Sequence, residues 1–205
     1  MRYITEEVNN AIGFLKANRS AEMAEIESVL ANTLYHVQFC GQKGRTSDLI
    51  FSPSQSNTAI ENAFIAAGWE AGVSLTNPGY DTGRNIDFYK NGVAIEVQFS
   101  HYGLCMTDIS RMERLFTRNL HLHPSPEGTL RPVVAGVEIV IDRSMPASQS
   151  VTHMDILRTR GAPIAQKLPL LMVGILPPQS GDSIILHNLV PRSRKSTFSQ
   201  LTTWK

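Results

Sequence analysis

The dipeptide Asn91-Gly92 constrains the fold of this chain more than any other short stretch. It separates two apolar runs in the stretch NIDFYKNGVAIEVQFSHYG, which covers residues 85–103. A two-residue type I′ turn requires positive φ at both central positions, and Asn-Gly is the dipeptide that most favours it. We therefore expect an antiparallel β-hairpin with Asn91-Gly92 as its loop.

The loop also sets the register of the expected hairpin. Counting outward from it gives the cross-strand pairs Lys90–Val93, Tyr89–Ala94, Phe88–Ile95, Asp87–Glu96 and Asn85–Gln98. Directly opposed residues point to the same face of a hairpin, with Cβ atoms about 4.5–5.5 Å apart. The acidic pair and the amide pair therefore share one face, and the opposite face is mostly apolar.

Two facing carboxylates, Asp87 and Glu96, repel each other unless something compensates their charge. A shared proton would raise one pKa. A divalent cation such as Mg²⁺, which prefers oxygen ligands, would bind both and could activate water for attack on a phosphate. The third interpretation is an exposed hairpin whose acids point to solvent. The residue pattern by itself leaves all three open.

Length and charge restrict the class of protein. The 205 residues suffice for one domain with a good core, and we expect a single domain over residues 1–205. The net charge of +1 gives no global signal for nucleic acid, although a basic cleft can exist in a neutral chain. Sparse cysteine, with only Cys40 and Cys105, indicates free thiols in an intracellular protein. Neither a signal peptide nor an apolar run of membrane-spanning length is visible, so we expect a cytoplasmic protein without membrane contact.

Apolar spacing predicts alternating helices and strands. Helices are expected over residues 5–18, 20–35 with Ser20 as N-cap, 56–69, 107–119 and 153–161. Beyond the hairpin, strands are expected over residues 47–53, 131–141, 168–176 and 182–190, a loop over 70–84 and a polar tail over 191–205. Helices before, between and after strands favour an α/β fold in which helices flank a mixed sheet on both faces.

The hairpin resembles the nuclease signature of the PD-(D/E)xK superfamily. An Asp is followed after eight residues by Glu-x-Gln, where most of the superfamily has Glu-x-Lys. The form VAIEVQFS resembles the BglII and BstYI branch of type II restriction endonucleases. The stretches LIFSPSQSNTAIENAFIAAGW, MPASQS and LPLLMVGIL also resemble that family, so the likeness covers about residues 45–195. It implies a restriction-endonuclease-like core.

The resemblance implies roles for the hairpin residues. Asp87, Glu96 and the carbonyl group of Val97 would be ligands of Mg²⁺, and Glu96 would also lie near the attacking water. Gln98 would complete the catalytic set with Asp87 and Glu96. Because Gln can only form hydrogen bonds, whereas Lys carries a charge, the metal would have to stabilise more of the developing negative charge.

The chain departs from the family shortly after Trp69. The family has a polar residue there that helps the site, and an ungapped comparison places Gly72 at that position. Either the role is missing in this chain, or Glu70 or Glu61 supplies it.

Residues expected to contact DNA lie outside the hairpin. They are Ser100, His101, Gln149, Ser150, Arg192 and Arg194. His101 stands where the family has Asn, so its contact must differ in geometry. The carboxamide of Gln149, in the family's base-reading loop, matches the donor and acceptor of adenine, and the two arginines suit phosphates or guanine.

The resemblance implies a type II restriction endonuclease that acts on double-stranded DNA as a homodimer. It implies a palindromic, GATC-centred six-base site cut with Mg²⁺ to leave 5′ overhangs, and a cognate DNA methyltransferase without stable contact. The alternatives are another nuclease of the same superfamily, for repair or nicking, and a DNA-binding module without catalysis. The intact set of Asp87, Glu96 and Gln98 argues against the last.

Overall fold

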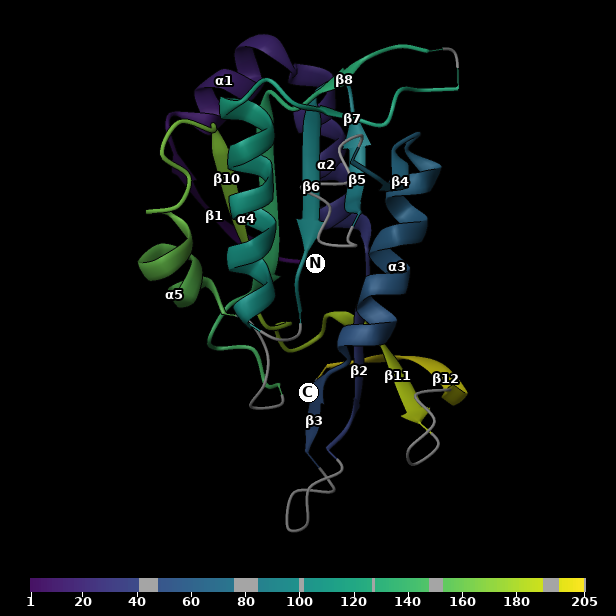
Figure 1. Ribbon diagram of the computed structural model, residues 1–205. Helices are drawn as coiled ribbons and strands as arrows, with labels where there is room; N and C mark the ends of the chain where they lie inside the picture. The colour runs from purple at the N-terminus through teal and green to yellow at the C-terminus, as the bar shows by residue number, and fades with distance from the viewer. Residues whose placement is uncertain are drawn as a thin grey trace.

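The computed structural model describes residues 1–40, 48–75, 85–99, 102–126, 128–147, 153–189 and 196–204 (Figure 1). Its helices are α1 (Ala11–Asn18), α2 (Ser20–Asn32), α3 (Pro53–Ala66), α4 (Tyr102–Thr117) and α5 (Met154–Ile156), and a π-helical turn over Leu157–Gly161 continues α5. In these ranges, no helix is both long and apolar enough to cross a membrane.

A six-stranded mixed sheet forms the centre of the molecule. Its order is β1 (Tyr3–Val8), β10 (Leu170–Ile175), β9 (Ala135–Ile141), β6 (Val93–Val97), β5 (Ile86–Lys90) and β4 (Glu70–Val73). Strand β9 runs parallel to both of its neighbours, whereas the other pairs are antiparallel. Strands β6, β9 and β10 are buried throughout, as expected of strands covered on both faces.

Each face of this sheet carries its own apolar cluster. On one face, alternate residues of the central strands pack against α1, α2 and α3, with Leu15, Ile26 and Phe64 among the buried side chains. On the other face they pack against α4, α5 and the π-helical turn, with Ile109 and Met154 buried. Figure 1 shows α4 lying across the front of the sheet. The expected mixed sheet with helices on both faces is confirmed.

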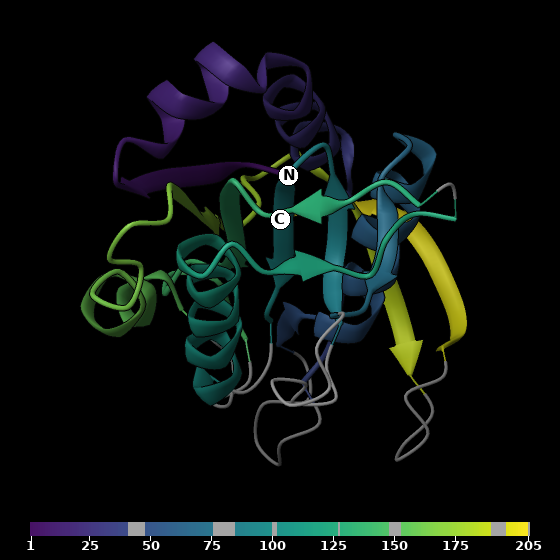
Figure 2. The ribbon, with the colours of Figure 1, turned by 45° about the horizontal axis from the view of Figure 1, so that its top comes forward.

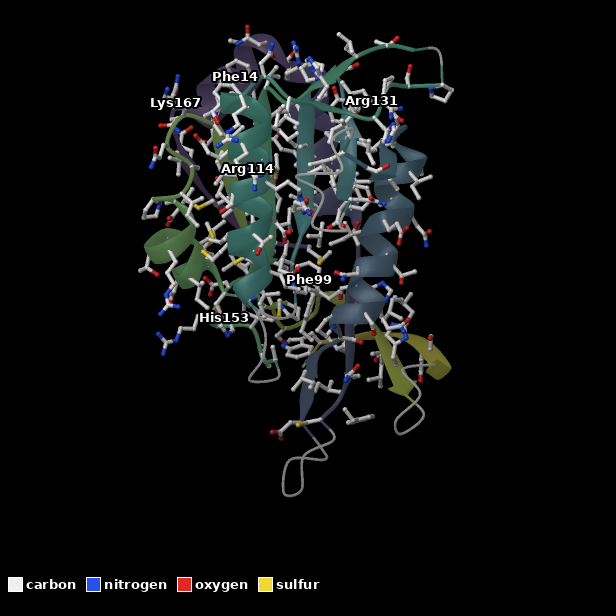
Figure 3. The ribbon with its side chains drawn as sticks, viewed as in Figure 1. Phe14, Phe99, Arg114, Arg131, His153 and Lys167 are labelled. Carbon is white, nitrogen blue, oxygen red and sulfur yellow. The ribbon has the colours of Figure 1, made fainter. Side chains whose placement is uncertain are left out.

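A smaller four-stranded sheet lies at one end of the larger one, below α3 in Figure 1 and drawn partly in yellow in Figure 2. Its order is β12 (Ser196–Thr203), β11 (Ser183–Leu189), β2 (Tyr35–Phe39) and β3 (Leu49–Phe51). The rings of Phe51 and Phe99 meet edge to face at 5.0 Å, and Figure 3 shows Phe99 where β6 ends towards this sheet. The Phe51 amide also donates a 2.6 Å hydrogen bond to the Pro146 carbonyl group, beyond β9. A third, two-stranded sheet consists of β7 (His121–Leu122) and β8 (Arg131–Pro132).

The predicted hairpin is confirmed near its loop. Asn91 and Gly92 have φ of 46° and 90°, as a type I′ turn requires. The ladder contains the pairs Phe88–Ile95, Tyr89–Ala94 and Lys90–Val93. The ladder does not continue to the expected pairs Asp87–Glu96 and Asn85–Gln98. The Val97 amide instead binds the Asp87 side chain, and the next amide along β6 donates to the Ile139 carbonyl group of β9.

The N-terminal prediction was partly wrong. Residues 3–8 form strand β1, which pairs with β10, and α1 begins only at Ala11. Asn9 and Asn10 both adopt positive φ, which separates the strand from the helix. Ser20 is the first residue of α2 and makes no capping hydrogen bond, so its predicted role as N-cap was wrong.

Besides the two-residue strand β7, three further strands lie where the pattern predicted none. Strand β2 begins at Tyr35, inside the helix predicted for residues 20–35, which ends at Asn32. Strand β4 falls in the predicted loop 70–84, and β12 in the polar tail. All three are edge strands or belong to the small sheet, so burial on one side only leaves a weak apolar signal.

Candidate active site

Asp87 and Glu96 lie where the hairpin ladder ends. The Val97 amide donates a 2.9 Å hydrogen bond to Oδ2 of Asp87, whose side chain is half-buried. Glu96 is 3% exposed. Because Glu96 is buried and Asp87 is half-buried, the interpretation of two acids that both point to solvent is wrong.

Burial raises the pKa of both acids above the ordinary values. For Asp87 the cause is desolvation, which outweighs hydrogen bonds from the Val97 amide and with the Glu96 side chain. For Glu96 desolvation is the largest cause and the negative charge of Asp87 the next, so its pKa is well above the usual range. The pair therefore disfavours a double negative charge, which fits either a shared proton or a bound cation.

A buried arginine partly compensates the negative charge of Glu96. On α4, Nη2 of Arg111 lies 2.5 Å from Oε1 of Glu96 and 2.8 Å from Oδ1 of Asp108, which precedes it by three residues. All three side chains are at most 6% exposed. One guanidinium therefore bridges the catalytic strand and the helix that covers it.

A further acid lies beside this group. Glu138 in β9 is opposite Glu96 in the parallel register of β6 and β9, and it is fully buried. Desolvation and then the negative charge of Asp108 raise its pKa well above the usual range. Among the described residues, both of its carboxylate oxygens have no hydrogen-bond partner.

A cavity of about 200 Å³ opens beside the acidic pair. Asp87 and Val97 line it from the hairpin, Asn57 and Glu61 from α3, and Gly72 from β4. The charge of Glu61 also acts on the pKa of Asp87. Glu61 and Glu70 were the candidates to replace the family's polar residue at the position of Gly72, and Glu61 lies at this cavity.

Glu70, the other candidate for that group, is engaged elsewhere. It forms an ion pair with Arg131 of β8 and lines a different, larger cavity near the hairpin loop. Asn57, one turn before Glu61 on α3, is a second polar residue at the site cavity that the sequence comparison did not suggest.

Gln98 lies two residues after Glu96 and is 9% exposed. Its amide donates a 2.9 Å hydrogen bond to the Ile139 carbonyl group, which attaches the end of β6 to β9. The six residues expected to contact DNA lie outside the described residues. They are Ser100, His101, Gln149, Ser150, Arg192 and Arg194.

The sequence as a whole matches one protein family. The family described as Restriction endonuclease BglII/BglIII matches residues 3–175, most of the chain. The chain belongs to the BglII/BglIII family of restriction endonucleases. It is accordingly a type II site-specific deoxyribonuclease.

Individual members of the BglII/BglIII family are similar to the chain in sequence and fold. The type II restriction enzyme BglII of Bacillus subtilis is 25% identical over 156 residues, covering 74% of this chain and 67% of that protein. The crystal structure of BglII complexed with a DNA 16-mer has a TM-score of 0.85 at 21% identity, covering 99% and 92% of the two chains. Free BglII has a TM-score of 0.72 at 22% identity, covering 99% and 94%. These likenesses confirm the restriction-endonuclease-like fold.

Membership of the BglII/BglIII family implies a divalent metal ion, and the donor set fits one. Asp87 and Val97 line one cavity, and burial and then the charge of Asp87 raise the pKa of the adjacent Glu96. Oxygen donors of this kind suit Mg²⁺ or Ca²⁺. Within the described part of the chain, no group of three or more His, Cys, Asp or Glu side chains could hold a metal by itself. Backbone oxygen, water and substrate oxygens would have to complete the coordination.

Sequence reasoning missed Arg111, Asp108 and Glu138. Glu138 could have been found as the one charge within the otherwise apolar stretch VVAGVEIVI. Asp108 and Arg111 lie one turn apart among the buried residues of α4, on the side of the helix that should be apolar. A charged pair at such positions indicates a buried partner on the facing sheet.

Proposed function

We propose that this chain hydrolyses double-stranded DNA at a short palindromic site, with Mg²⁺ as cofactor, and leaves 5′ overhangs. The observation that carries the proposal is the buried acidic pair beside an open cavity in a chain of the BglII/BglIII family. The resemblance of VAIEVQFS and MPASQS to that family favours a GATC-centred site of six base pairs.

In this proposal, Asp87, Glu96 and the Val97 carbonyl group hold the cation. Bound Mg²⁺ would acidify a water molecule and stabilise negative charge on the phosphate. The hydrogen bond from the Val97 amide fixes the Asp87 carboxylate at the mouth of the cavity. Gln98 orients a group at the reacting phosphate through hydrogen bonds, and Glu61 adds negative charge on the other side of the cavity.

DNA contacts are proposed for the residues around the active strand and in two later segments. Ser100 and His101 would follow the catalytic strand onto the DNA, and Gln149 would read adenine with Ser150 beside it. Separately, Arg192 and Arg194 would contact phosphates or guanine. Strand β9 leads towards the Gln149 segment, because Met145 and Ala147 pack on the core just before it.

The assembly follows from the palindrome. Two copies of one chain related by a twofold axis place identical contacts on both half-sites, so we propose a homodimer of single-domain chains spanning 1–205. A methyltransferase of the same specificity would protect host DNA without stable contact. Because the substrate is DNA that enters the cell, we place the enzyme in the cytoplasm.

Two alternatives remain for experiment. A repair or nicking nuclease of the same superfamily would use the same acidic pair but cut without a fixed palindrome. A binding module would have lost its metal ligands, and the presence of Asp87 at the cavity with Glu96 beside it argues against that.

Digestion of a plasmid library with the full-length chain and Mg²⁺, followed by sequencing of the ends, tests the proposal. We expect every end to carry the same 5′ overhang within one palindrome, and no ends in EDTA. Ends scattered over unrelated sequences would favour the repair nuclease. Specific retention of a duplex without any cleavage would favour the binding module.

A further inference from the structure

Arg111 occupies the place of a counter-ion at the catalytic acid Glu96. Its guanidinium is 6% exposed, lies 2.5 Å from the Glu96 carboxylate, and is anchored by Asp108 at 2.8 Å. Removing one partner of such a buried pair would leave an uncompensated charge. Any cation that binds Glu96 has to share this carboxylate with the arginine.

A second acceptor for the guanidinium lies one strand away. Glu138 points to the same face of the sheet as Glu96, because the two residues are opposite each other in the parallel register. Helix α4, which carries Arg111, covers that face. Burial raises the pKa of Glu138, and the positive charge of Arg111 offsets part of that rise, so the two groups are within electrostatic range.

The buried state of Glu138 calls for an explanation. Neither of its carboxylate oxygens has a hydrogen-bond partner in the described structure, although the side chain is 0% exposed. A buried polar group without a partner is destabilising and rare in native proteins. Glu138 therefore has the properties of an acceptor that is used in a different state of the site.

We propose that Arg111 is a positioning residue with two acceptors: it binds Glu96 in the cation-free protein and moves to Glu138 when a divalent cation binds at Asp87 and Glu96. This inference rests on the cation site of the proposed function. It explains why α4, the helix after β6, carries the buried Arg111 and why β9 carries the buried Glu138. Asp108 anchors the guanidinium from the same helix, at 2.8 Å.

The test is calorimetric titration of the DNA-free full chain with Ca²⁺, which measures binding without cleavage. An opposite charge within about 4–6 Å changes the proton affinity of a carboxylate by roughly 10- to 1,000-fold. Arg111→Met should therefore bind Ca²⁺ about tenfold more tightly or better, because no guanidinium competes for Glu96. Glu138→Gln should bind it about tenfold more weakly, because the displaced arginine loses its second acceptor.

A double-mutant cycle separates this exchange from a simple change of charge. If Glu138 acts through Arg111, Glu138→Gln has no effect on Ca²⁺ affinity once Arg111→Met is present. Arg118→Met is the matched control, since it removes an exposed positive charge directly after α4 and should leave the affinity unchanged. Asp87→Asn should abolish the binding heat and so locate the cation.

Each outcome is decisive. Equal or weaker Ca²⁺ binding by Arg111→Met, with normal binding by the unmodified chain, overturns the inference and leaves the proposed function intact. No binding by either protein overturns the cation site and the inference with it. If Arg111→Met fails to fold, Arg111→Gln removes the charge while keeping a donor, and an unchanged affinity in Glu138→Gln would by itself overturn the exchange.

Discussion

The backbone amide of Val97 donates a hydrogen bond to the side chain of Asp87, at 2.9 Å, where an antiparallel ladder would use a backbone carbonyl group. The carboxylate thus replaces one rung of the hairpin. The Val97 amide on β6 therefore helps to fix the orientation of the Asp87 carboxylate, in addition to the rotamer preference of Asp87. The same strand pair therefore supplies both Asp87 and Val97, which line the cavity.

Asp87→Asn should abolish cleavage in Mg²⁺ and leave specific DNA binding in Ca²⁺ largely intact. The amide oxygen of Asn can still accept the Val97 hydrogen bond, so the hairpin is kept while the charged ligand is lost. Cleavage and electrophoretic mobility shift assays on one cognate duplex measure the two properties. Asp155→Asn, a partly exposed acid on α5, is the control and should cleave normally. Full activity of Asp87→Asn would remove Asp87 from the site.

Gln98→Ala should slow single-turnover cleavage by roughly 10²-fold or more, if Gln98 orients a group at the reacting phosphate. Metal affinity should change much less than in Asp87→Asn, because a carboxamide is not a primary ligand of this site. Quench-flow rates at saturating enzyme and Mg²⁺ give the comparison. Gln166→Ala changes an exposed glutamine and should have no effect. A rate equal to that of the unmodified enzyme would make Gln98 a scaffold residue.

Gln149→Ala should weaken binding to the cognate duplex far more than to random DNA. A bidentate base contact is worth about 1–3 kcal/mol per half-site, and a dimer loses it twice. Arg194→Ala, if Arg194 clamps a phosphate, should weaken both duplexes alike and reduce the salt dependence. Titrations against cognate and scrambled duplexes at two salt concentrations distinguish these results. Equal loss on both duplexes in Gln149→Ala would exclude base reading by that residue.

The stability of the small sheet should depend on a histidine pair. Nδ1 of His36 and Nε2 of His187 are 2.7 Å apart, and burial together with the charge of His187 lowers the pKa of His36 from 6.5 to about 4. A lowered pKa in the folded state means that this stabilisation is complete above pH 6.5 and is lost as pH falls towards 4.

At pH 4 the free energy of unfolding should have fallen by roughly 1–2 kcal/mol through His36, a value reduced because the ring is partly exposed. His36→Gln cannot gain a proton and should show a shallower decline. Urea unfolding at pH 7 and pH 4.5 measures this change in the free energy of unfolding. The control is His123→Gln, which changes an exposed histidine and should behave like the unmodified chain. Identical pH profiles for His36→Gln and the unmodified chain would contradict the assignment.

Local chemistry made the core of the fold predictable. Asn91-Gly92 determines both the turn and the pairing of the three rungs next to it, because few dipeptides accept two positive φ angles. Strands β9 and β10 were predictable from continuous apolar runs, since both faces are buried. Strand β1 was not, because its sequence YITEEV has two adjacent acids and no clear alternation, and its partner β10 is unknown from the sequence.

Within the site, only the residues joined by the hairpin turn were predictable from the sequence. Asp87 and Glu96 are joined by one turn, so local rules bring them close. Arg111 reaches Glu96 from α4, the next helix after β6, but the sequence does not specify which face of the sheet that helix covers. Glu138 is adjacent to Glu96 only because β6 and β9 are parallel neighbours, a pairing made over more than 40 positions.

The hydrogen bond from Phe51 to Pro146 joins β3 of the smaller sheet to the segment that follows β9. Met145 and Ala147, on either side of that proline, also pack against the core cluster that contains Phe51. The base of the MPASQS segment is therefore held by two sheets at once. Anyone who redesigns the sequence preference of this enzyme by transplanting that segment has to keep β3 in place beside it, because the graft otherwise loses one of its two attachment points.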